Sequence, residues 1–217
     1  MTASTRTLGP RLPVPSGNFV VLDFEATCSN GTGPIEVPRG EMEIIEIGAI
    51  AVDPELNTLS EFARFVRPVR HTTLSAFATE LTTITQADVD AAEDFKAVAA
   101  ELALWAAENE ISWWGSWGKY DRSQLTQDVR FHRFPDPLPQ PHFNIKESFS
   151  ERQGIKRRLG LGGAVKTAGL SFEGTAHRAI SDTRNIARLL PWILGTAVLA
   201  NPTDFSQADI EERVSKH

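Results

Sequence analysis

The chain has 217 residues, of which 41% are hydrophobic and 23% charged, a composition typical of one globular domain with a substantial core. Its net charge of −6 argues against a protein that coats nucleic acid through its whole surface. The single cysteine, Cys28, excludes an intramolecular disulfide, and no apolar run is long enough for a transmembrane helix. We therefore expect a cytoplasmic protein without a membrane partner.

Proline content and periodicity divide the chain into three parts. Residues 1–17 contain three prolines and no apolar run of signal-peptide length, which predicts a disordered leader. Residues 18–196 carry the periodic elements and are expected to form one domain. Residues 197–217 are expected to be a short C-terminal tail.

In the first half of the domain, the sequence pattern predicts three strands followed by a helix. A strand at residues 19–22 runs into two acids, and residues 43–68 indicate two further strands joined by a turn at 53–57, which would form a hairpin. Within residues 93–110, apolar side chains recur at spacings of three, four and three, the period of an amphipathic helix.

The second half alternates strand and helix. We expect a strand at 111–116, a helix at 119–132, a proline-rich loop, and a last strand at 142–146. Two or three helices then close the fold, one of them over residues 179–194. This order predicts an α/β fold, a mixed five-stranded sheet with helices on both faces, in which chemistry usually lies at strand ends and helix starts.

Two acids at the exit of the first strand suggest a metal site. Asp23 and Glu25 are two residues apart in an extended segment, so their side chains point to the same side and can converge. Two carboxylates this close repel each other unless a cation lies between them, and Mg²⁺ or Mn²⁺ suits such ligands. The alternative is an exposed turn with two solvated acids.

Two later stretches add acids and a histidine at helix starts. Asp121 follows a predicted strand at the head of a helix, and His177 precedes a helix that has Asp182 in its first turns. Each acid is also explained as an ordinary partner of a helix N-terminus. This explanation of the single acids does not account for the fact that all three acidic clusters lie at the ends of core elements.

The motifs DFEAT, WGKYD and HRAISD resemble the three motifs of the DEDDh class of 3′-to-5′ exonucleases, the DnaQ-like branch of the ribonuclease-H-like fold. The resemblance extends from about Phe19 to Leu194 and is most similar to the branch of Eri-type and histone-mRNA exonucleases and KapD-like proteins. Thr83 stands where that branch usually has Gly, and Tyr120 where the animal enzymes usually have Trp. Ala179 occupies the place of the tyrosine of the sister class, which favours the His subclass.

The resemblance implies roles for five residues. Asp23, Glu25, Asp121 and Asp182 would hold two divalent ions, Mg²⁺ or Mn²⁺, about 4 Å apart, with Asp23 bridging both. His177 would deprotonate the attacking water, a task suited to imidazole because its ordinary pKa is about 6.5.

Substrate contacts are expected around these residues. Ala26 and Thr27 would bind the terminal sugar, as in similar enzymes, and Phe77 and Tyr120 are candidates for base stacking, with core packing as the alternative. Residues 145–178 hold seven basic and three acidic side chains, and Arg178 in this segment could guide the phosphate backbone. Arg157, Arg158 and Lys166 could do the same, or form a solvated face. The stretch GLGGAVKT (160–167) fails the P-loop pattern, because Val165 precedes the Lys.

The resemblance thus implies a metal-dependent 3′-to-5′ exonuclease that releases nucleoside 5′-monophosphates from single-stranded 3′ ends, with RNA favoured over DNA. One alternative is a non-catalytic nucleic-acid- or protein-binding module on the same fold, which would not need the complete set of acids and histidine. Another is a DNA proofreading exonuclease, which would need a polymerase-binding tail.

Overall fold

The computed structural model describes residue 12 and residues 16–200; the predicted leader 1–17 and the tail 197–217 lie largely outside these. A five-stranded mixed sheet has the order β3-β2-β1-β4-β5. β1 pairs antiparallel with β2 and β2 antiparallel with β3, whereas β4 is parallel to both β1 and β5. The strands are β1 (Phe19–Ala26), β2 (Ile44–Val52), β3 (Thr58–Phe65), β4 (Trp113–Ser116) and β5 (His142–Asn144).

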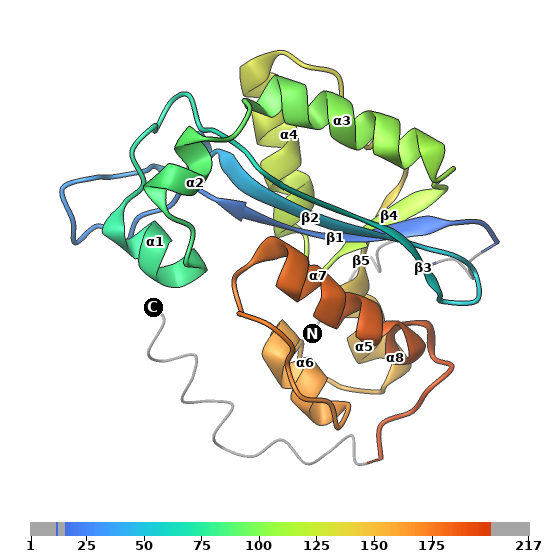
Figure 1. Ribbon diagram of the computed structural model, residues 1–217. Coiled ribbons are helices and arrows are strands. Elements are labelled where there is room, and N and C mark those ends of the chain that lie inside the picture. Colours follow the sequence, from blue (N-terminus) through green and yellow to red (C-terminus); the bar gives the residue numbers. More distant parts are fainter. Residues whose placement is uncertain (1–11, 13–15, 201–217) are drawn as a thin grey trace, which may run out of the picture.

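Helices cover both faces of the sheet (Figure 1). α3 and α4 lie on one face and α5 to α8 on the other, whereas α1 and α2 lie beyond the end at which β1 exits. The helices are η1 (Arg39–Glu41), α1 (Ala76–Thr82), α2 (Gln86–Asp90), α3 (Phe95–Glu108), α4 (Tyr120–His132), α5 (Ile145–Arg152), α6 (Leu161–Thr167), α7 (Ala179–Arg188) and α8 (Leu190–Leu194). The predicted α/β fold is confirmed.

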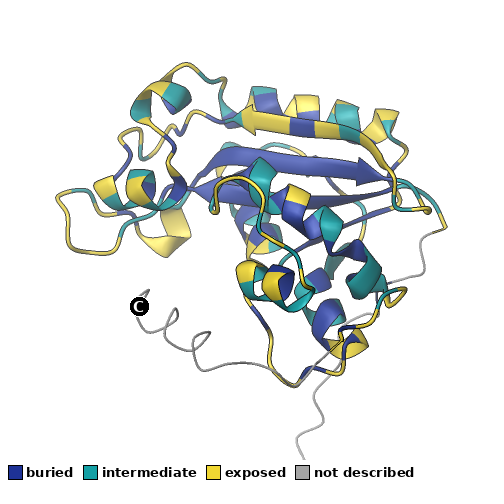
Figure 2. Ribbon diagram, turned by 60° about the horizontal axis from the view of Figure 1, so that its bottom comes forward, coloured by how far each residue is buried: buried dark blue, intermediate teal, exposed yellow. Residues whose placement is uncertain are grey.

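Alternation along the strands explains the two layers. In β1, Val20 and Leu22 pack in the core beneath α3, while Phe19 and Val21 pack against α5 to α8. Figure 2 shows the inner strands buried and the edge strand β3 largely exposed. Asp23 and Glu25 follow the odd-numbered positions of β1, so they lie on the side of the sheet that α7 covers.

The closing helices differ from the prediction. Four helices follow β5 in the described residues, where two or three were expected, and the helix predicted over 179–194 is divided between α7 and α8. Pro191 lies in the first turn of α8, where its missing N–H costs no hydrogen bond, whereas inside a continuous helix it would break one. The GLGGAVKT stretch forms α6.

The described chain also bears on the predicted boundaries. Leu12 and Leu199 are both buried in the core beneath α5 to α8, and the Leu199 N–H donates to Gln153 Oε1 at 2.9 Å. Packing therefore reaches beyond both ends of the predicted domain 18–196, whose limits stay a prediction. None of the helices in the described part of the chain is long and apolar enough to cross a bilayer.

Candidate active site

The exit of β1 places two carboxylates under α7. Glu25 is only 8% exposed, and its cross-strand neighbour on β2 is a second buried acid, Glu46. The pairing register shifts between Glu25 and Ala26, a bulge of the kind that re-aims side chains at functional sites. Asp23 lies on the same side of the strand, two residues earlier.

Asp121 joins this pair from α4. β4 runs parallel to β1 and ends at Ser116, so the start of α4 comes to the end of the sheet at which β1 exits. The Phe24 N–H, located between the two acids of β1, donates to Asp121 Oδ1 at 3.1 Å. This bond fixes the first turn of α4 against the exit of β1 and leaves Asp121 buried.

A close contact between α7 and β2 positions Asp182 in the site. A Cβ on Gly48 would lie 2.3 Å from the carbonyl carbon of Ala179, so only glycine permits this approach. Thr183 Oγ1 donates to the Gly48 carbonyl oxygen at 2.9 Å and fastens the helix there. Asp182, one residue before Thr183, is thereby held over the acids of β1.

His177 precedes α7 in a strained conformation. Its φ of 61° lies in the left-handed region, which a non-glycine residue adopts at a cost and often at functional sites. Its backbone N–H donates to Asp182 Oδ2 at 3.3 Å. One ligand atom each from Glu25, His177 and Asp182 all lie within 4.8 Å of one another, a spacing at which the three could hold a metal ion.

The acids destabilise one another's charged forms. Burial raises the pKa of Asp23 well above its ordinary value, and Asp121, Glu25 and Asp182 raise it further. Burial, together with Asp182 and Glu46, raises the pKa of Glu25 to about 9. Burial also raises the pKa of Asp182 to about 7, and that of Asp121 to about 6 against the opposing effect of the Phe24 N–H. A cation would relieve this repulsion.

One oxygen of the cluster lacks a partner. Asp182 Oδ1 is buried and accepts no hydrogen bond from any residue that the structure describes. Burying a carboxylate oxygen without a donor is costly, so such groups are usually paired or coordinate metals. The set of donors therefore fits a hard divalent cation.

Glu46 is a member of this region that the sequence patterns did not assign. It is 3% exposed and accepts from the Arg178 guanidinium, with Nη2 to Oε1 at 3.0 Å, and from the Ala179 N–H at 2.9 Å. It thus ties the start of α7 to β2. The available signal was a charged residue inside an otherwise apolar strand, which requires a partner.

The predicted substrate residues lie around the acids in different settings. Ala26 is buried, and the Thr27 side chain is 1% exposed, with Oγ1 accepting from the Glu43 N–H at 2.9 Å. Phe77 on α1 is half-buried, whereas Tyr120 at the start of α4 is 47% exposed. The Thr27 hydroxyl therefore has a structural contact, and substrate binding by these four residues stays a prediction.

The positive charge of the segment 145–178 is partly neutralised by neighbouring acids. Arg178 pairs with Glu46, and Arg158 pairs with Glu147 on α5. Binding of substrate phosphate by Arg178 would have to compete with a buried carboxylate. At Thr83, where the resemblance implies Gly, φ is 62° at the C-terminal end of α1, a conformation that glycine adopts without strain.

Comparison with known proteins places the chain in a family. Residues 20–190 match the family described as Exonuclease (RNase T), and the protein belongs to this family. In the nuclease domain of 3′hExo, described as a DEDDh family member bound to rAMP, the fold is similar over 83% of this chain and 92% of that one, with a TM-score of 0.74 and 28% identity. The DEDDh resemblance is confirmed.

Two curated relatives are also named as 3′-5′ nucleases. The 3′-5′ exonuclease eri1 of Schizosaccharomyces pombe is 29% identical over 201 residues, covering 79% of this chain and 66% of that protein. The human 3′-5′ exoribonuclease 1 is 28% identical over 179 residues, covering 78% of this chain and 50% of that protein. The chain thus spans about half to two thirds of the length of these relatives.

Proposed function

We propose that the protein is a metal-dependent 3′-to-5′ exonuclease that releases nucleoside 5′-monophosphates from single-stranded 3′ ends and prefers RNA to DNA. The observation that carries this proposal is the convergence of Asp23, Glu25, Asp121, Asp182 and His177 at the exit of β1, with one buried carboxylate oxygen that has no partner among the described residues. A protein that only bound nucleic acid would gain nothing from crowding four acids where phosphates approach.

The four acids hold two divalent ions, Mg²⁺ or Mn²⁺. The raised pKa values of Glu25 and Asp182, caused by burial and neighbouring acids, fit groups whose charge a cation balances. When bound, the ions stabilise the charge on the attacking and leaving oxygens of the phosphate. Gly48 and the Glu46–Arg178 pair position Asp182 for this task through α7.

His177 acts as the general base. Its place beside Glu25 and Asp182, on the segment that leads into α7, supports this role. It accepts the proton of a water whose oxygen bonds to the phosphorus of the terminal phosphodiester. The bond from phosphorus to the 3′ oxygen of the preceding nucleotide breaks, and that oxygen takes a proton from solvent and becomes the new 3′ end. General-base catalysis of this kind typically contributes about 10²- to 10⁴-fold.

The preference for RNA rests on relatives. The human relative is named as an exoribonuclease, and one similar structure, with a TM-score of 0.73 and 27% identity, is described as 3′-end specific recognition of a histone mRNA stem-loop by 3′-exonuclease. The backbone of Ala26 and the side chains of Phe77 and Tyr120 are the groups that we assign to the terminal nucleotides.

The test is a time course on 5′-labelled single-stranded RNA and DNA of matched sequence, with Mg²⁺ or Mn²⁺. We expect a ladder that shortens from the 3′ end, is faster on RNA, and disappears with a chelator or in Asp23→Asn. Asp90→Asn makes the same replacement at an exposed site on α2 and should retain activity. A ladder that persists in Asp23→Asn, or no ladder with either ion, would contradict the proposal.

A further inference from the structure

An open pocket lies on the outer side of α4, away from the acids. It has a volume of about 500 Å³, and its lining includes Gly40, Arg70, Ser123, Gln127, Arg130 and Phe131. Within the described part of the chain, the lining is polar and carries two arginines but no acid. Such a pocket suits an anionic ligand.

The pocket lies along α4, the helix whose first turn carries Asp121. Tyr120, Ser123, Gln127 and Arg130 recur at spacings of three, four and three, so they form one stripe on the helix. The buried stripe of the same helix, which includes Asp121 and faces the sheet, is its neighbour. The exposed stripe begins at Tyr120, beside Asp121, and ends at the two arginines of the pocket.

At the far end of the stripe, a positively charged arginine stacks on an aromatic ring. The guanidinium carbon of Arg70 lies 3.8 Å from the centroid of the Phe131 ring, and Phe131 is itself 37% exposed. The Arg130 side chain is exposed and makes no hydrogen bond or ion pair with any residue that the structure describes. Planar guanidinium groups of this kind bind phosphates and stack on bases.

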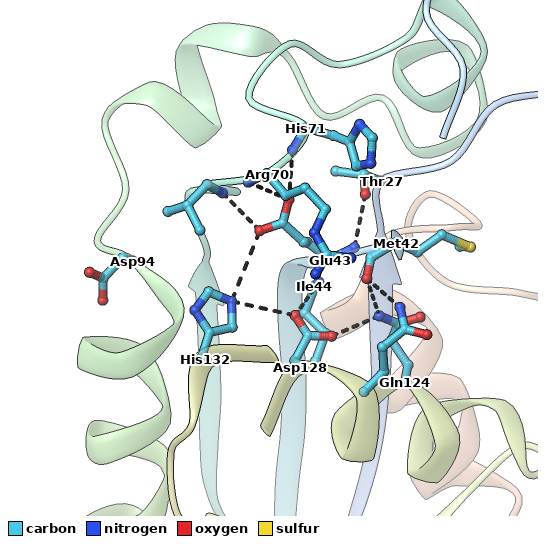
Figure 3. A network of polar contacts seen from close by, with 12 residues as sticks. Thr27, Met42, Glu43, Ile44, Arg70, His71, Asp94, Gln124, Asp128 and His132 are labelled. Carbon is cyan, nitrogen blue, oxygen red and sulfur yellow. Dashed lines mark hydrogen bonds and ion pairs between the residues drawn. The ribbon is translucent and has the colours of Figure 1, made fainter. Parts of the chain in front are cut away.

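A buried network beneath the pocket fixes the position of Arg70 (Figure 3). Glu43 is 2% exposed, and its carboxylate accepts from three consecutive backbone N–H groups, those of Val69, Arg70 and His71, each at 2.8 Å. The segment that carries Arg70 is thereby held beside α4 before any ligand arrives.

Side chains of α4 complete the network from the other side. Asp128 Oδ1 accepts from the Ile44 N–H at 3.1 Å, and Gln124 Nε2 donates both to Asp128 Oδ2 at 2.7 Å and to the Met42 carbonyl at 2.9 Å. Gln127, which lines the pocket, also donates to the Met42 carbonyl, at 2.6 Å. The acids that face Arg70 from below, Glu43 and Asp128, are thus already occupied by donors.

We infer that the exposed stripe of α4, from Tyr120 to Arg130 with Arg70 and Phe131 beside it, binds the upstream nucleotides of the strand whose 3′ end lies at the acids. This inference rests on the proposed exonuclease function. Arg70 and Arg130 bind backbone phosphates, while Ser123 and Gln127 offer hydrogen bonds between them. The stripe starts at the acids, so it favours the substrate strand over a separate phosphorylated partner.

The helix geometry sets the length of substrate that can use the pocket. Arg130 is nine residues beyond Asp121, about 13 Å along the axis at about 1.5 Å per residue. At about 3.4 Å per phosphate in a stacked strand, this distance corresponds to about four nucleotides. A dinucleotide reaches only the acids, whereas an oligonucleotide of 12 residues reaches both arginines.

The experiment compares KM and kcat of wild type and Arg130→Ala on a 12-nucleotide RNA and on a dinucleotide. We expect KM for the 12-mer to rise about tenfold, as for the loss of one charge-assisted hydrogen bond, with kcat and all dinucleotide constants unchanged. The slope of log KM against log salt should fall by about 0.7 in magnitude. Arg70→Ala should act similarly, and Arg130→Lys should recover part of the loss.

Arg64→Ala is the matched control, because it removes an exposed arginine on β3, away from the stripe. An Arg130→Ala enzyme with an unchanged KM for the 12-mer, or one that is impaired equally on both substrates, would overturn the inference while the exonuclease proposal stands. Wild-type protein that cleaves neither substrate would overturn the exonuclease proposal and this inference with it.

Discussion

Two groups of buried carboxylates lie at the same end of the sheet and have opposite surroundings. Glu43 accepts three backbone N–H bonds, and Asp128 accepts one backbone and one side-chain N–H. In the candidate active site, by contrast, Asp23, Glu25 and Asp182 face mainly one another, and Asp182 Oδ1 has no donor among the described residues.

We propose that this difference separates structural acids from metal-binding ones. A buried carboxylate with several backbone donors, such as Glu43, stabilises the fold, because its hydrogen bonds offset the cost of leaving water. A carboxylate crowded by other acids destabilises the fold until a cation binds. Burial alone would class all of these residues together, and only the identity of their neighbours divides them.

The strongest test of this division is Asp182→Asn. Nuclease activity should fall by at least about 100-fold, because even the outer partners of metal ligands are typically worth about 10- to 100-fold. The thermal midpoint of the metal-free protein should rise, since the substitution removes a repelling charge. Labelled-RNA assays and thermal melts with chelator measure the two effects, and a variant that is less stable but fully active would reverse the assignment.

Glu43→Gln should show the converse pattern. A Gln side chain has one acceptor oxygen where Glu has two, so the N–H groups of residues 69–71 lose one of their two acceptor atoms. We expect a loss of about 2 to 3 kcal/mol in the free energy of unfolding. Urea denaturation measures the loss. Glu36→Gln, at an exposed position, should stay within about 0.5 kcal/mol of wild type, and equal effects in both variants would remove the structural role of Glu43.

Gly48→Ala tests how the acids are brought together. The added Cβ would lie 2.3 Å from the Ala179 backbone, so α7 must move, at a cost of about 1 to 3 kcal/mol in stability and with a loss of activity. Gly33→Ala places the same methyl group in open space and should be neutral. Normal activity in Gly48→Ala would mean that the site tolerates a displaced Asp182.

A last test concerns the pH dependence of stability. Because the folded-state pKa of Glu25 is raised to about 9, the folded protein binds more protons than the unfolded one between about pH 4 and 9. The stability from this group is complete below about pH 4 and is lost as the pH rises through about 9. Glu25→Gln should therefore give a flatter profile of unfolding free energy from pH 6 to 9 in chelator.

Added Mn²⁺ should offset the loss in wild type at high pH, since a ligand that binds only the folded state stabilises it. Profiles of equal slope in wild type and Glu25→Gln would show that the crowding of the acids does not govern this dependence.

Much of the fold was predictable because its signals are local. The hairpin of β2 and β3, the amphipathic α3, and the strand–helix unit of β4 and α4 all have clear periodicity or turns, and these predictions are confirmed. α1 and α2 were not assigned as helices, because seven and five residues are too short to show a period. Their capping by Ser75 and Thr85 is visible only in the structure.

The sequence by itself determined the class of fold, the family and the five candidate catalytic residues, because these lie in compact motifs at the ends of periodic elements. The tertiary structure alone decided which other residues serve them. Glu46 and Gly48 matter only because α7 crosses β2 at that point, and Thr27 and Arg178 have structural partners that are distant in sequence. The stripe from Tyr120 to Arg130 forms a candidate binding surface only together with Arg70, which Glu43 holds beside it. Contacts of this kind depend on long-range packing, so the sequence contains no local pattern that predicts them.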